Sequence, residues 1–61
     1  MGWRNIAISH ADDIVEAAVA FSAVVGDRLG PRVTPIEALE AARRLKAEVD
    51  QAVEFLEAEI E

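Results

Sequence analysis

Residues 34–37, Thr-Pro-Ile-Glu, constrain the fold of this chain most strongly, because they predict where a long helix begins. In a capping box, the Thr34 hydroxyl accepts a hydrogen bond from the Glu37 N–H, and the Glu37 carboxylate accepts one from the Thr34 N–H. Pro35 stands at the first helical position, where its missing N–H and fixed φ suit a helix. Apolar residues at helical spacing follow, so we predict a helix over about residues 35–60.

An earlier helix is predicted over about residues 10–29. Ser9 has the character of an N-cap residue, and Gly30-Pro31 favours the end of a helix and a turn over about residues 30–34. The predicted core of this helix recurs at a spacing of four, three and four residues and consists of Ile14, Ala18, Phe21 and Val25.

The second helix has an apolar seam of the kind seen in coiled coils, with core positions at alternating spacings of four and three residues. The seam consists of Ala38, Ala42, Leu45, Val49, Ala52 and Leu56. A short connection makes two helices antiparallel neighbours. We therefore predict an all-α fold, in which residues 9–61 form a two-helix antiparallel hairpin and residues 1–8 form a short N-terminal arm. The sequence of the arm fits either an extended segment or a helical extension.

Two interpretations of the arm remain open. Trp3 is an aromatic residue near a chain end, and such residues often anchor a contact with a partner protein. Alternatively, Trp3 closes the end of the chain's own bundle over Leu56 and Ile60. The sequence fits either interpretation.

The size of the chain predicts self-association. A chain of 61 residues buries a small core, and small domains usually gain stability from disulfides, a metal ion or oligomerisation. The chain has no cysteine and one histidine, His10, which leaves oligomerisation. Between Ile14 and Val25 the only polar residues are Glu16 and Ser22, so the first helix has more apolar surface than one neighbour covers. We expect a homodimer in which two hairpins form a four-helix bundle.

The charges predict how the two hairpins are oriented. Residues 26–46 carry five basic and three acidic residues, a net charge of +2, whereas residues 47–61 carry six acidic residues and none that is basic. A hairpin therefore has a basic turn end and an acidic end at the termini. Head-to-tail packing of two hairpins places each acidic end beside a basic turn, and it favours the dimer through opposite charge.

No residues in the chain form a pattern typical of catalysis or of a cofactor. The three hydroxyl residues lack a histidine base at a suitable spacing, and there is no phosphate-binding glycine loop. A di-iron bundle needs Glu-x-x-His motifs, which are absent. We therefore expect a protein that is not an enzyme and that has no catalytic, cofactor-binding or metal site.

These features predict a non-enzymatic protein–protein interaction module, a homodimerising hairpin with an acidic surface. The alternative is a small acidic regulator or inhibitor that binds a basic cleft on a target protein, such as a phage-type inhibitor or a nucleic-acid mimic. The net charge of −6 argues against nucleic acid as the partner, and no apolar segment is long enough to span a membrane. The residues expected to contact another protein are Trp3, Glu54, Glu57 and Glu61.

The composition also suggests a setting for the protein. The absence of cysteine is compatible with the cytoplasm. Five arginines against one lysine, together with twelve alanines, are typical of a GC-rich bacterial or phage genome. We expect a soluble cytoplasmic protein of such an origin.

Overall fold

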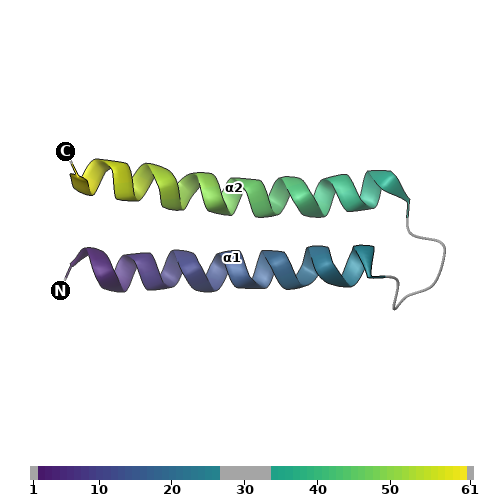
Figure 1. Ribbon diagram of the computed structural model, residues 1–61, viewed down its shortest axis with the longest axis horizontal. Helices are drawn as coiled ribbons and strands as arrows, with labels where there is room; N and C mark the ends of the chain where they lie inside the picture. The colour runs from purple at the N-terminus through teal and green to yellow at the C-terminus, as the bar shows by residue number, and fades with distance from the viewer. Residues whose placement is uncertain (1, 27–33, 61) are drawn as a thin grey trace.

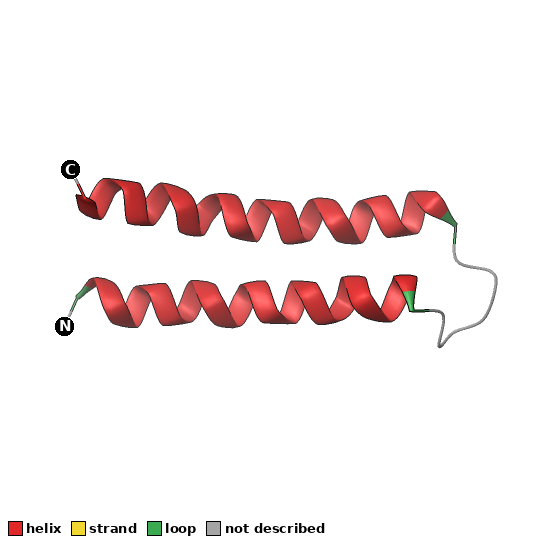
Figure 2. Ribbon diagram, viewed as in Figure 1, coloured by secondary structure: helices red, strands yellow, loops and turns green. Residues whose placement is uncertain are grey.

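A computed structural model describes residues 2–26 and 34–60, and these form two helices packed against each other. Helix α1 covers Trp3–Val25 and helix α2 covers Pro35–Ile60. The two ends of the chain lie at the same end of the molecule, so the helices run antiparallel (Figure 1). The described part of the chain contains no strand (Figure 2). The prediction of an all-α hairpin is thus confirmed for these residues.

The start of α2 follows from the capping box. The Thr34 N–H donates to Glu37 Oε2 at 3.0 Å, and the Glu37 N–H donates to Thr34 Oγ1 at 3.3 Å. These reciprocal bonds satisfy backbone donors that the first turn of a helix leaves without partners. The capping box predicted from the sequence is therefore present.

The start of α1 differs from the sequence prediction. The helix begins at Trp3, so residues 3–8 are its first turns rather than a separate arm. Ser9 is not an N-cap but a helical residue, whose hydroxyl donates to the Asn5 carbonyl four residues earlier, at 3.4 Å. A cap signal marks only a permitted helix start, and nothing between Trp3 and Ser9 interrupts a helix.

The other end of α1 comes earlier than expected. The helix ends at Val25, and the Gly26 N–H donates to the Ser22 carbonyl at 2.7 Å. The predicted turn at Gly30-Pro31 and the last residues of the predicted first helix lie outside the described residues.

The two helices meet along a seam of partly buried residues with alternating spacings of three and four. This repeat keeps one stripe of each helix facing the other. On α1 the seam consists of Ala7, His10, Ile14, Ala17, Phe21 and Val24. On α2 it consists of Ala38, Ala41, Leu45, Glu48, Ala52 and Phe55.

Two side-chain contacts between the helices mark the register of the hairpin. The rings of His10 and Phe55 lie 5.5 Å apart between centroids, at an angle of 38°. Further along, Arg44 Nη2 lies 3.9 Å from Glu16 Oε1. His10 therefore lies partly buried within the seam.

The hairpin is a single layer of helices. Its Cα atoms extend over 46 × 17 × 9 Å, with a radius of gyration of 14.3 Å. A compact domain of this length has a radius of gyration of about 10.5 Å. Both broad faces of the hairpin are therefore open, and the seam is the only place where the described helices cover each other.

Candidate protein-interaction surface

The hairpin buries very little of its apolar side-chain surface. Among the described residues Ala17 alone is buried, and twelve large apolar side chains are exposed. Isolated exposed apolar residues are normal on a protein surface, but contiguous patches indicate a contact site. Whether these twelve side chains form a contiguous patch therefore decides whether the surface is a candidate contact site.

Most of the exposed apolar residues form a second row on each helix, which follows the seam one residue later. Because every member except Ile60 comes directly after a seam residue, the row has the same alternating spacing and runs the length of the helix, and Ile60 continues that spacing beyond the last seam residue. On α1 the row consists of Ile8, Ala11, Val15, Ala18, Ser22 and Val25. On α2 it consists of Leu39, Ala42, Lys46, Val49, Val53, Leu56 and Ile60.

The two second rows lie on the same side of the hairpin. Both helices are right-handed and they run in opposite directions, so a step of one residue beyond the seam rotates toward the same broad face in each. We call this side, made of the two second rows, the apolar face. Its residues include Ile8, Val15 and Val53, with exposed fractions of 53%, 60% and 46%.

The opposite side of the hairpin, made of residues that come one place before the seam, is polar. It carries Glu16 and Arg44, whose ion pair bridges the two helices. Its other charged residues are Asp13, Glu37, Glu40 and Glu54. The hairpin is therefore amphipathic as a whole, with one polar and one apolar broad face.

Lys46 is the only charged residue in the α2 part of the apolar face. Its Nζ donates to Asp50 Oδ2 at 2.8 Å, one helical turn further on. This hydrogen bond, together with the attraction of the Asp50 carboxylate, raises the pKa of Lys46 above its usual value. Both side chains remain largely exposed, so the pair is accessible to a partner.

The predicted core residues fall on two stripes rather than one. Ile14, Phe21 and Leu45 lie partly buried on the seam. The other four predicted core residues belong to the apolar face: Ala18, Val25, Val49 and Leu56. The seam contact that sequence analysis missed is made by Phe55, next to the expected Leu56.

The predicted contact residues lie at the end of the hairpin that holds the termini. Trp3, together with Leu56, Glu59 and Ile60, lines a shallow hollow there. The Trp3 ring also lies 5.6 Å from Arg4 Cζ, a cation–π contact. Trp3 therefore lies near Leu56 and Ile60, but Trp3 is 47% and Ile60 86% exposed, so the ring does not cover that end of the hairpin.

The acidic side chains near the C-terminus point into solvent. Glu54 and Glu57 are exposed, and neither forms an ion pair with another described residue. Glu61 lies outside the described residues. These carboxylates are therefore available to basic groups on another molecule.

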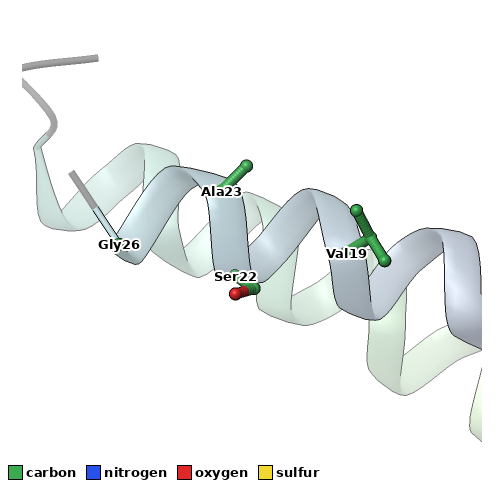
Figure 3. A pocket seen from close by; sticks show the side chains of 4 residues that line it. All are labelled: Val19, Ser22, Ala23 and Gly26. Atoms are coloured by element: carbon green, nitrogen blue, oxygen red, sulfur yellow. The ribbon is translucent and has the colours of Figure 1, made fainter. Parts of the chain in front are cut away.

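A second hollow offers little chemistry for a small ligand. It lies on the outer side of α1 and is lined by Val19, Ser22, Ala23 and Gly26 (Figure 3). The Val19 and Ala23 side chains project on one side of the helix and the Ser22 hydroxyl on another (Figure 3). The hollow thus presents one hydroxyl group and no charged side chain, whereas ligand sites usually have several convergent polar groups.

Two further kinds of site are missing from the described ranges. Residues 2–26 and 34–60 contain no group of three or more histidine, cysteine or acidic side chains placed to hold a metal ion. Neither α1 nor α2 combines the length and the apolar character that crossing a bilayer requires.

No match was found among known protein families, curated proteins or solved structures. The apolar face is the most distinctive surface of the described part of the chain.

Proposed function

We propose that this protein is a non-enzymatic interaction module that homodimerises through the apolar face and forms a four-helix bundle. The observation that carries the proposal is the second, mainly apolar row along each helix, on one side of a single-layer hairpin. Burial of apolar surface is the dominant favourable term in protein association. Two copies with their apolar faces together would gain the second layer that a helical fold normally has.

The exposed surface of one chain supports this proposal. The chain has a solvent-accessible surface of 4909 Å². A folded monomer of 6.6 kDa exposes about 3,900 Å². The difference is close to the surface that each partner loses in a standard interface, about 800 Å². One hairpin therefore exposes roughly enough extra surface to form a stable dimer.

The polar face would remain outside in this dimer, together with the exposed carboxylates of α2. A bundle with such a surface would present acidic groups to a further protein, consistent with a small soluble protein of the cytoplasm. The net charge of −6 per chain would keep the dimer dispersed in solution.

Two charge insertions at nearby positions of α2 test the proposal. Val49→Asp adds a carboxylate to the apolar face, and Ala47→Asp adds the same group to the polar face. We expect light scattering to give a dimer for the Ala47 variant and a monomer for the Val49 variant, because a buried unpaired charge is costly. Equal masses for the two variants would contradict the proposal, whether both are dimers or both are monomers.

The acidic surface favours a second candidate function. Exposed carboxylates at Glu54 and Glu57 are the feature expected of a small acidic regulator that occupies a basic cleft. Such a protein would displace a short DNA duplex from a basic DNA-binding domain, and Glu54→Gln with Glu57→Gln would weaken the displacement. If the wild-type chain leaves the duplex bound, this second function is excluded for that class of target.

A further inference from the structure

We infer that α2 of each copy packs antiparallel on α2 of the other copy, and that Lys46 of each chain pairs with Asp50 of the other near the two-fold axis. This inference rests on the proposed self-association and adds the orientation of the two copies. It assigns Lys46 and Asp50 a role in the choice of that orientation.

The charge along α2 supports the antiparallel orientation. Residues 35–46 carry three basic and two acidic residues, a net charge of +1, and residues 47–60 carry five acidic residues and none that is basic, a net charge of −5. Antiparallel α2 helices place each acidic half beside a half of opposite sign. A dimer with both turns at one end would instead place the two acidic halves at the same end, where they repel each other.

The apolar row of α2 is also complementary in shape to the same row of the second copy. When two α2 helices overlap along their full length, Leu39 lies opposite Leu56 of the second copy. On the same alignment Ala42 lies opposite Val53, which pairs a small side chain with a larger one. Alternation of small and large side chains lets facing layers interdigitate without voids.

Lys46 lies near the middle of α2, where the two-fold axis would pass. On the same alignment it faces Val49 of the second copy, one residue from Asp50. Its Nζ already bonds Asp50 of its own chain at 2.8 Å, and the exposed fractions of the two side chains are 76% and 53%. Two such pairs beside the axis would form a cluster of alternating charges. A single polar position within an apolar seam is a known way to fix helix orientation.

The opposite orientation offers Lys46 no such partner. With both turns at one end, α1 of the second copy would lie over α2. Because the hairpin sets His10 beside Phe55 and the Arg44 side chain near Glu16, Lys46 would then meet Val15 and Ala18 on the apolar face of α1. There Lys46 keeps its hydrogen bond to Asp50 of its own chain but gains no carboxylate from these residues of the second copy, so this orientation lacks the added charge attraction.

Cysteine cross-linking tests the orientation, since the natural chain has no cysteine. In the inferred dimer of a variant that carries both Ala42→Cys and Val53→Cys, the thiol at position 42 of each chain lies opposite the thiol at position 53 of the other. Each single substitution alone leaves its thiols about 16 Å apart along the bundle, too far for a disulfide. We expect the double variant, after oxidation, to run on a non-reducing gel at about twice 6.6 kDa and the two single variants to run at 6.6 kDa.

A second double variant, Ile8→Cys with Leu56→Cys, reports the opposite orientation, in which α1 lies on α2 of the other copy. In the inferred dimer the thiols of this variant lie about 20 Å or more from those of the other chain along the bundle. A covalent dimer from this variant, with none from the Ala42 and Val53 variant, would overturn the inference but leave the homodimer in place. A wild-type chain that is monomeric by light scattering would overturn both. Lys46→Asp provides a further test, since it should weaken the inferred dimer and Asp50→Lys in the same chain should restore it.

Discussion

Shortening Val53 to alanine should weaken the dimer about tenfold. The substitution removes two methyl groups, worth about 1.6 kcal/mol if they were fully transferred from water. The Val53 side chain is 46% exposed in the hairpin. Burying that exposed part at the interface therefore contributes roughly half of the transfer free energy, about 0.7 kcal/mol per chain. A symmetric dimer contains two copies, which gives about 1.5 kcal/mol and a factor of about ten in Kd.

Val19→Ala is the matched control for this measurement. Val19 is the same residue type, is 62% exposed, and lies on the outer side of α1 rather than on the apolar face. Both substitutions raise helix propensity by a similar amount, so that effect cancels in the comparison. Analytical ultracentrifugation over a range of concentrations gives Kd for each variant. An equal change in Kd for both variants, or a change for Val19 alone, would refute the assignment of the apolar face.

Three smaller tests concern the hairpin itself. Leu45→Ala should lower the free energy of unfolding by about 2 kcal/mol, as measured by chemical denaturation at a fixed protein concentration. This is the lower end of the range for Leu-to-Ala changes in cores, because Leu45 is only partly buried on the seam. Thr34→Ala should cost about 1 kcal/mol in the same assay, since it removes one of the two capping bonds, and Thr34→Ser should cost less. Arg44→Gln should change stability by less than about 0.5 kcal/mol, because its bridge to Glu16 is 3.9 Å long and exposed. A large loss for Arg44→Gln, or none for Leu45→Ala, would show that the seam has been misplaced.

The sequence predicted the elements of the fold because their signals are local. The Thr34 capping box and the position of Pro35 depend only on neighbouring residues, and α2 begins there as expected. The start of α1 was harder to predict, because Ser9 and the two aspartates after it favour a helix start but are also tolerated on the exposed side of a helix interior. Nothing in the sequence between Trp3 and Ser9 distinguished an arm from a helical extension.

The choice of the seam could not be predicted from spacing alone. On each helix two neighbouring rows have the same alternation of three and four residues, and both are mostly apolar. Leu56 and Val49 were expected on the seam, but Phe55 and Glu48 take those places. A ring such as Phe55 fills the space beside His10, an arrangement that the hydrophobic pattern does not encode. The same ambiguity explains why the apolar face emerged only from the structure.

The most direct test of the account is the molar mass of the wild-type chain in solution, measured by light scattering at low salt and at about 0.5 M salt. We predict a mass of twice 6.6 kDa at low salt and partial dissociation at high salt, since salt screens the attraction between opposite charges. A mass of 6.6 kDa at every concentration and at both salt levels would contradict the account.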